Sequence, residues 1–368
     1  MKIVAFVIST WLLLAPSPQV SWQPVAPGVE YAQVVRDVPW SIHLLRVDPS
    51  QTRLDVVHAR NRAVGLDTVS TIARETGAIA AVNGGYFRMT GDFAGDSTGT
   101  LQIDGRLFSE PDRGRAAVGF ARTATATRVV MGHVAWRGTV TAGRATRPLN
   151  GLNRPRRQNE LVLFTADFEE TTLTDEMGTE ALVRDGRVVN IRDGEGSTRI
   201  PSNGFVLSAT GTARSWMRTN LRPGTAVTVV TGLMPVNRST TNVWKDAEDI
   251  LGAGPKLVTA GRIDITSSRE KMAPAFRSTR HPRTAIASLA DGRVLLLVVD
   301  GRQPLLSAGM SLDELARFLL DQDAVEAINL DGGGSTTMVV KGDVVNHPSD
   351  PTGERRVSDA VLVRPARR

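Results

Sequence analysis

Short runs of β-branched and aliphatic residues, separated by tight turns, make up most of the chain and predict β-hairpins. Asp-Gly pairs interrupt such runs within 103–107, 183–188 and 289–294, and both residues of an Asp-Gly pair accept the positive φ that two-residue hairpin turns require. Looser versions of the pattern stand at 259–262 and 340–344. Because the spacing between the hairpins is irregular, the pattern argues against a solenoid or a propeller.

Helices are expected to be few. Thr68 is placed to cap a helix over 68–76 and Gly77 to end it. In 311–322 the pair Ser311 and Glu314 forms a capping box. An apolar stripe predicts that this second helix packs on the core and carries no chemistry. Its members are Leu312, Leu315, Ala316, Leu319 and Leu320.

Two unbroken apolar runs, 294–299 and 327–330, flank the second helix. A run without alternation is typical of a central strand covered on both faces, and strand–helix–strand predicts a crossover within one sheet. Asp300 and Asp331 directly follow the two runs, so parallel strands would deliver both carboxylates to the edge where open sheets bind ligands. We predict an α+β fold: a β-rich mixed sheet with few helices and one crossover near the C-terminus.

The first residues have the character of an export signal. One positive charge at Lys2 precedes an apolar stretch over 3–15, which is too short to cross a bilayer of ~30 Å and suits the core of a signal peptide. We assign 1–24 to a signal peptide, with an uncleaved N-terminal anchor as the alternative. Residues 25–368 are then one domain with an N-terminal β extension. The expected location is secreted or periplasmic, at the cell envelope, with no stable membrane span after processing.

Composition excludes several classes of function. The chain is 41% hydrophobic and 22% charged, which permits a packed core, and the absence of cysteine excludes disulfides, thiolate zinc sites and a cysteine nucleophile. The net charge of +6 comes mostly from scattered arginines without interleaved aromatic residues, so no nucleic-acid partner is expected. The five histidines are dispersed and have no paired spacing, so a histidine-based zinc site is not expected from the sequence. Neither a Gly-x-Ser-x-Gly elbow nor a dinucleotide-binding fingerprint is present.

Two glycine-rich segments near strand ends are candidates for binding. An apolar run enters Asn83-Gly84-Gly85, where the backbone either turns sharply or closely approaches a ligand. Lys256 follows another glycine-rich bend in a chain with few lysines. Its ammonium group is suited to an anion, although a solvated lysine explains the pattern equally well.

A third and a fourth segment carry charge as well. Arg283 and Arg302 flank one hairpin, which suggests an anion clamp, with ion pairing to Asp300 as the structural alternative. The fourth segment, 329–338, places three glycines after an aspartate at the end of a buried strand. Backbone N–H groups of such a run are able to form an anion-binding nest. The segment is not a P-loop, because no Gly-Lys-Ser/Thr follows.

Together these four segments resemble the phosphodiester glycosidase family. The motifs are Asn-Gly-Gly-Tyr-Phe at 83–87, Gly-Ala-Gly-Pro-Lys-Leu at 252–257, Pro-Arg-Thr-Ala-Ile at 282–286 with Asp-Gly-Arg at 300–302, and Asn-Leu-Asp-Gly-Gly-Gly-Ser-Thr at 329–336. The resemblance runs from about residue 78 to 363 and includes the closing stretch 344–360. Two departures are Asp359, where many relatives carry Asn, and an unusual loop over 95–99.

The resemblance implies an exported hydrolase that cleaves between the anomeric carbon of a sugar and a phosphate oxygen. The substrate would be a sugar-1-phosphodiester in a phosphate-containing glycan or a cell-surface polysaccharide. An oxocarbenium-like transition state needs a carboxylate, for which Asp331 is the first candidate and Asp300 the second. The expected substrate-binding residues are Asn83, Gly84, Lys256, Arg283, Arg302, Asn329, Gly332, Gly333, Gly334, Ser335 and Thr336.

Two other functions stay open on the sequence. One is a phosphodiesterase that breaks the P–O bond with a divalent cation held by Asp300 and Asp331. The other is a non-catalytic binder of anionic cell-wall polymer. No cofactor is certain, and a divalent cation is the one candidate.

Overall fold

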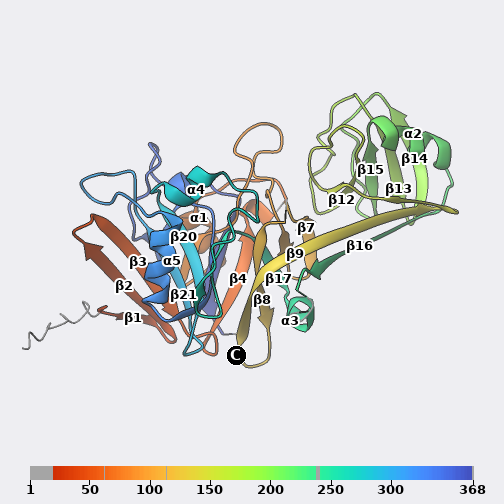
Figure 1. Ribbon diagram of the computed structural model, residues 1–368. Helices are drawn as coiled ribbons and strands as arrows, with labels where there is room; N and C mark the ends of the chain where they lie inside the picture. Colours follow the sequence, from red (N-terminus) through yellow and green to blue (C-terminus); the bar gives the residue numbers. More distant parts are fainter. Residues whose placement is uncertain (1–19, 62, 113, 238–240, 367–368) are drawn as a thin grey trace, which may run out of the picture.

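The protein was analysed as a computed structural model, which describes residues 20–61, 63–112, 114–237 and 241–366. Figure 1 shows a layered main body and a smaller lobe held away from it by a long two-stranded ribbon. The main body contains the two sheets whose strand ends form the candidate site. Most of the segment 1–24 assigned to an export signal lies outside the described residues.

The larger sheet of the main body has eight strands in the order β1-β2-β3-β21-β20-β22-β18-β19. All neighbouring strands are antiparallel. The strands are β1 (Gln23–Ala26), β2 (Val29–Arg36), β3 (Trp40–Val47), β18 (Lys256–Thr259), β19 (Arg262–Ile263), β20 (Arg283–Leu289), β21 (Val294–Val299) and β22 (Ala324–Asn329). Because β20 lies between β21 and β22 and opposes both, β21 and β22 are parallel.

The smaller sheet of the main body has five strands in the order β24-β23-β5-β25-β4, again antiparallel throughout. They are β4 (Thr52–His58), β5 (Ala80–Asn83), β23 (Met338–Val340), β24 (Asp343–Val344) and β25 (Asp359–Pro365). This sheet therefore joins the C-terminal strand β25 to β4 and to β5, the strand that carries Asn83. The first and last strands in that list, β4 and β25, pair along their whole length.

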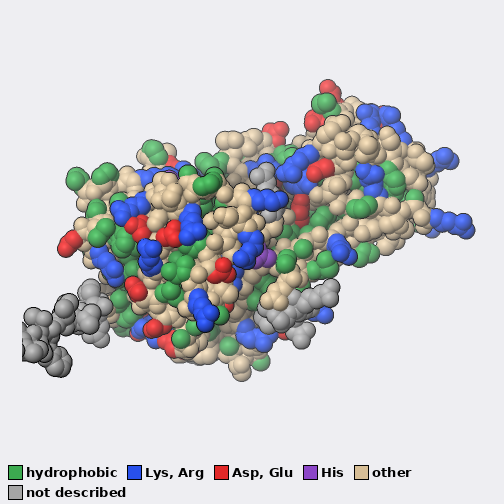
Figure 2. Space-filling view, viewed as in Figure 1, with side chains coloured by type: hydrophobic (Ala, Val, Ile, Leu, Met, Phe, Trp, Pro, Cys, Tyr) green, Lys and Arg blue, Asp and Glu red, His purple; other side chains and the backbone are tan. Residues whose placement is uncertain are grey.

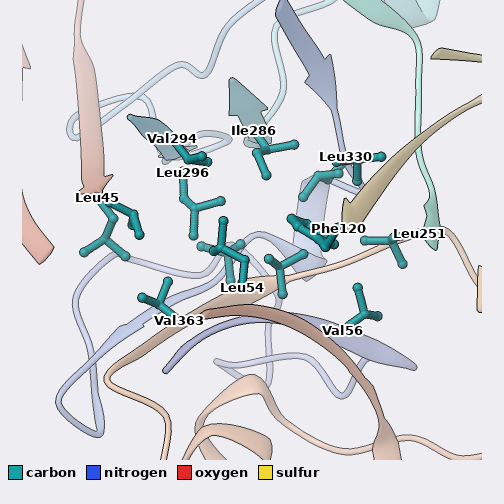
Figure 3. Close-up of a cluster of buried hydrophobic side chains, with 14 of the residues drawn as sticks. Leu45, Leu54, Val56, Phe120, Leu251, Ile286, Val294, Leu296, Leu330 and Val363 are labelled. Atoms are coloured by element: carbon teal, nitrogen blue, oxygen red, sulfur yellow. The ribbon is translucent and has the colours of Figure 1, made fainter. Parts of the chain in front are cut away.

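The two sheets pack face to face around one apolar core. Figure 3 shows side chains from β3, β4, β20, β21 and β25 meeting there, with Phe120 and Leu251 closing one side. Alternate residues of β21 divide between two cores: Leu296 faces this cluster, whereas Leu295 and Leu297 face the helix α5 (Leu312–Leu320). This two-sided burial explains why the strand is apolar at every position.

Helices cover the outer faces of both sheets. α5 packs on the larger sheet, and α1 (Val69–Thr76) packs on β5 and β25 of the smaller one. The predicted caps are confirmed: Thr68 accepts from Thr71 N, and Ser311 forms a capping box with Glu314. The described residues also contain α2 (Gly211–Asn220), α3 (Thr241–Asp246), α4 (Pro274–Ser278) and the 3₁₀ turns Ala59–Asn61 and Gly333–Ser335.

A third sheet leads out of the body to the lobe. Its order is β10-β9-β8-β17-β6-β7, with β16 also pairing with β9. The strands are β6 (Leu101–Ile103), β7 (Arg106–Ser109), β8 (Ala116–Arg122), β9 (Thr127–Ala142), β10 (Ala145–Pro148), β16 (Val227–Pro235) and β17 (Asp249–Gly252). The long pair of β9 and β16 is the ribbon in Figure 1.

The lobe has a five-stranded sheet of its own and a separate apolar cluster. Its strands are β11 (Gly151–Leu152), β12 (Leu161–Thr165), β13 (Thr179–Arg184), β14 (Arg187–Asp193) and β15 (Gly204–Ala209). The assignment of 25–368 to one domain stays a prediction, because the lobe has its own core but remains joined through the ribbon.

The fold class predicted from sequence is confirmed: the structure is β-rich, with short helices and a crossover from β21 through α5 to β22. All five expected hairpins are present. Among the described residues no helix is long and apolar enough to cross a membrane.

Candidate functional site

The ends of three strands from two sheets meet at one place. Since β21 and β22 are parallel, Asp300 and Asp331 leave the larger sheet at the same edge. β5 of the smaller sheet ends at Asn83, whose side-chain amide donates to the backbone oxygen of Asp331 over 2.8 Å. The backbone N–H of Asp331 donates to Gly84 O at 3.0 Å. Residues 248 positions apart are therefore in direct contact.

Asn83 braces the glycine loop, which we define as residues 331–336. Its Oδ1 accepts from the Thr284 hydroxyl at 2.7 Å and from Thr337 N at 3.2 Å. The side chain is fully buried, and both polar atoms of its amide are already engaged. The structure therefore places Asn83 as a support of the loop, and not as a free group facing a sugar.

Asp331 is a partly buried carboxyl group with an unusual environment. Burial raises the pKa of Asp331 to about 6, and the nearby charge of Asp359 acts in the same direction. The N–H of Gly332, which donates to Asp331 Oδ1 at 2.9 Å, and the charge of Arg355 favour the carboxylate but do not compensate fully. A carboxyl group with a pKa near neutrality is suited to a change of protonation state during catalysis.

Two arginines pack directly on the glycines of the loop. A Cβ atom on Gly333 would lie 2.9 Å from Nη2 of Arg302, and one on Gly334 would collide with the guanidinium of Arg355. Gly333 also has a φ of 62°, which disfavours other residues. The glycine run thus provides space for two guanidinium groups against the loop backbone, an arrangement that suits an anionic ligand. Nε of Arg355 is also paired with Asp350 at 2.6 Å.

Several buried polar atoms at the loop have no hydrogen-bond partner. Such atoms are costly unless a ligand or water satisfies them. They are Asn329 Oδ1, Ser335 Oγ, Thr336 Oγ1 and Thr337 Oγ1. Three consecutive residues and Asn329 thus carry unsatisfied oxygens beside a carboxyl group and two arginines, which indicates a site for a polar, hydroxyl-rich ligand.

Asp300 lies at the same sheet edge but is fully engaged. Its Oδ1 accepts from Asn346 Nδ2 at 3.1 Å and His347 N at 2.8 Å, and its Oδ2 lies 3.2 Å from His43 Nε2. Burial opposes ionisation, but these hydrogen bonds prevail and hold the pKa of Asp300 below its ordinary value. Asn346 Nδ2 also donates to Thr336 O at 3.1 Å. Asp300 therefore supports the glycine loop indirectly, through Asn346.

Two expected phosphate ligands direct their charges elsewhere. Nζ of Lys256 lies 2.6 Å from a carboxylate oxygen of Glu326, three positions before Asn329 on β22. Arg283 is buried at the strand end, and burial lowers its pKa to about 10. Its guanidinium donates to three backbone carbonyl groups at 2.9 Å. These belong to Phe276, Thr279 and Met310. Both residues therefore act as structural ties in this structure, because buried cations need partners.

Several site residues were missed by the sequence reasoning. Tyr86 donates to Gly254 O at 2.7 Å and accepts from Asn329 Nδ2 at 3.0 Å, and burial raises its pKa. Arg115 stacks on the Tyr86 ring, 4.8 Å from its centroid. Tyr86 and Arg355 do lie inside segments that carry the family resemblance, which was the available signal, but Arg115 lies in a segment with no recognisable motif.

Asp359 is the second carboxylate close to Asp331. It accepts from the N–H of Gly85 at 2.6 Å and from the Ser97 hydroxyl at 3.2 Å. A Cβ atom on Gly84 would collide with this carboxylate. The small residues after Asn83 therefore make room for Asp359, and Gly84 contacts the site through its backbone.

A cleft of about 710 Å³ is lined by residues of the main body, of β9 and of the lobe. Ser97 and Arg115 belong both to its lining and to the surroundings of the site. Trp136 of β9 contributes an aromatic face. Burial raises the pKa of Asp96 in this cleft to about 7. Figure 2 shows basic side chains spread over the body and the lobe on the face in view.

The structure resembles solved structures over most of its length. A hypothetical protein from Synechocystis superposes with a TM-score of 0.80 over 95% of this chain and 64% of its own, at 24% identity, which shows a shared fold. A Burkholderia pseudomallei protein described as exported superposes with a TM-score of 0.78 at 28% identity, over 89% of this chain and 74% of its own.

Sequence relatives match a shorter region. The chain is 45% identical over 91 residues to N-acetylglucosamine-1-phosphodiester alpha-N-acetylglucosaminidase of Bos taurus, which is 23% of this chain and 17% of that protein. The match thus spans less than a fifth of the bovine relative. The sequence profile of the phosphodiester glycosidases covers residues 177–364, just over half of the chain and all of the glycine loop. The matched region contains Asp331 and both arginines of the site, Arg302 and Arg355. The chain therefore belongs to the phosphodiester glycosidase family.

Proposed function

We propose that this protein is an exported hydrolase that cleaves the glycosidic bond of sugar-1-phosphodiesters, in a phosphate-containing glycan or a cell-surface polysaccharide. The observation that carries the proposal is the glycine loop, where a carboxyl group of raised pKa, two arginines and four unsatisfied oxygens come together. The apolar stretch 3–15 and the similarity to a Burkholderia pseudomallei protein described as exported support export.

Asp331 is the proposed catalytic carboxyl group. Its carboxylate would stabilise or attack the anomeric carbon as positive charge develops there. The leaving group is a phosphate monoester, which departs readily once its charge is neutralised. Arg302 and Arg355, which pack on the loop backbone beside Asp331, would supply that neutralisation. Asp300 serves as a positioning residue, since its oxygens are engaged by His43, Asn346 and His347.

The unsatisfied oxygens and the cleft suggest how the sugar and the rest of the substrate are held. Asn329 Oδ1 and the hydroxyl groups of Ser335 and Thr336 would bind sugar hydroxyls, because these polar atoms otherwise stay unpaired. The remainder of a glycan chain would extend into the cleft that Arg115 joins to the site.

The test is hydrolysis of a panel of α-linked sugar-1-phosphate methyl diesters in H₂¹⁸O. Cleavage at the anomeric carbon places ¹⁸O in the released sugar, whereas a phosphodiesterase places it in the phosphate. D331N should abolish turnover, and D343N, at an exposed position on β24, should not. Label in the phosphate, or no turnover across the panel, would refute the proposal.

A further inference from the structure

Beside the glycine loop, three side chains of metal-ligand type converge from distant parts of the chain. His43 lies on β3, Asp300 follows β21 and His347 follows β24. His43 Nε2 lies 3.2 Å and His347 Nδ1 3.5 Å from the same oxygen, Asp300 Oδ2. One ligand atom from each residue lies within 4.8 Å of the others.

These separations fit a tetrahedral metal ion. Zinc binds histidine nitrogen and carboxylate oxygen at about 2.0–2.2 Å, so neighbouring ligand atoms of a tetrahedral site are roughly 3.3–3.5 Å apart. The separations of 3.2 and 3.5 Å from Asp300 Oδ2 agree with that edge length, and the two imidazole nitrogens lie within 4.8 Å of each other. Two imidazoles and one carboxylate also form a donor set that suits zinc better than magnesium or calcium, which prefer oxygen ligands.

The atoms that would not touch a metal ion are held by neighbours. Tyr31 Oη lies 2.7 Å from His43 Nδ1, the ring nitrogen opposite the proposed donor. Asp300 Oδ1 accepts from Asn346 Nδ2 and His347 N, which leaves Oδ2 directed at the two imidazoles. Partners of this kind orient ligands in known metal sites.

The site is open on one side. His43 and Asp300 are buried, whereas the side chain of His347 is 58% exposed. A metal ion therefore has a path from solvent, and three protein ligands leave a fourth position for water or a substrate oxygen. Ser41 Oγ, 3.2 Å from His43 Nε2, is the competing partner when no ion is bound.

We propose that His43, Asp300 and His347 bind one divalent transition-metal ion of the zinc class. Binding would tie the segment around His347 to the larger sheet. Through Asn346, which bonds both Asp300 and Thr336 O, the ion would also hold the glycine loop. This proposal goes beyond the proposed hydrolysis and does not depend on it.

The test is calorimetric titration of ZnCl₂ into the full mature chain, made without a histidine tag and dialysed against EDTA. We expect one equivalent to bind. H347A should weaken binding at least tenfold, and because His347 is exposed, the variant should fold as the parent does. The matched control is H133A, which removes another histidine from a carboxylate pair, with Glu270 at 3.1 Å, and should leave the affinity unchanged.

Two further measurements separate a metal site from a hydrogen-bonded triad. Co²⁺ bound in place of Zn²⁺ should give the intense visible absorption of a tetrahedral ion, and H347A should remove it. Tyr31→Phe keeps the ring but removes the partner of His43, and should weaken Zn²⁺ binding by about 10–100-fold. Absence of stoichiometric binding by the parent chain, or equal affinity of the parent and H347A, would overturn the proposal.

Discussion

At the scale of single residues, the proposed chemistry of this protein centres on Asp331 and its immediate neighbours. Its raised pKa results from burial and from the second carboxylate at Asp359. Because the folded state raises the pKa above its ordinary value, ionisation of Asp331 opposes folding, and this residue's contribution to stability decreases as pH rises from about 4 to about 6. A residue that costs stability in its charged form is a typical component of an active site.

The activity should depend on the ionisation of Asp331. If its carboxylate is the reacting form, kcat/KM should fall as pH decreases through about 6. Asp359→Asn should shift this limb to lower pH, because it removes a nearby negative charge. The measurement is the pH profile of kcat/KM for both proteins. An unchanged limb in the variant would mean that Asp331 does not govern it.

Arg302 should bind the phosphate. Arg302→Ala should reduce kcat/KM by roughly 10–100-fold, since a charged hydrogen bond contributes about 1.5–3 kcal/mol. The φ of 61° at this position is unfavourable for arginine and for alanine alike, because both carry a Cβ atom. The substitution should therefore not destabilise the fold through the backbone. Arg262→Ala, at an exposed position on β19, is the control for loss of one positive charge. Equal activity of both variants would exclude Arg302 from the site.

At the scale of secondary structure, the crossover from β21 through α5 to β22 positions the two aspartates. Parallel strands deliver Asp300 and Asp331 to one edge, and α5 covers the face of the sheet behind them. β5 then brings Asn83 from the second sheet to fasten the glycine loop. The loop is thus fixed by two sheets, which allows it to carry unsatisfied polar atoms.

The capping box of α5 should contribute measurably to stability. Ser311→Ala removes the acceptor for Glu314 N and should lower the free energy of unfolding by about 1 kcal/mol. The measurement is the midpoint of urea denaturation followed by circular dichroism. Ser202→Ala, at an exposed loop position, should leave the midpoint unchanged. A shift of equal size in both variants would contradict the structural role of the cap.

At the scale of the whole molecule, the lobe converts an edge site into a cleft. Arg154 joins the lobe to the body, because it bonds Glu110 after β7 at 2.6 Å and Glu160 in the lobe at 2.7 Å. Burial keeps the pKa of Glu110 above its ordinary value even against this partner. The ribbon of β9 and β16 provides a second connection. The cleft between the main body and the lobe, of about 710 Å³, has a volume in the range typical of ligand-binding sites.

Trp136 should matter only for extended substrates. Trp136→Ala removes an aromatic face from the cleft and should raise KM for an oligosaccharide phosphodiester on the order of tenfold, from lost apolar contact. KM for a methyl diester should not change, since the small substrate does not reach β9. Trp216→Ala, which removes a partly buried indole from α2 of the lobe and not from the lining of the cleft, is the control. Equal effects on the small and large substrates would contradict this use of the cleft.

Local patterns alone determined much of this protein. The apolar run at β21, the Asp-Gly hairpins, and the caps of α1 and α5 are encoded within a few neighbouring residues, and all of them were predictable for that reason. The short helices α2 and α4 were not predicted, since neither has a side-chain cap. Within the site, the glycine run pointed to Asp331 because three consecutive glycines have no explanation in regular structure.

The direction of each charged side chain was decided only by the tertiary structure. Lys256 turned out to be paired with Glu326, Arg283 to bond backbone carbonyl groups, and Asp300 to meet a histidine 257 positions earlier in the chain. Arg355 meets Gly334 of the glycine loop from 21 positions further along the chain. The partner of a charged side chain need not be near it in sequence, because the folded chain brings distant segments together. The local sequence pattern therefore identifies the candidate residues, and tertiary packing determines what each of them contacts.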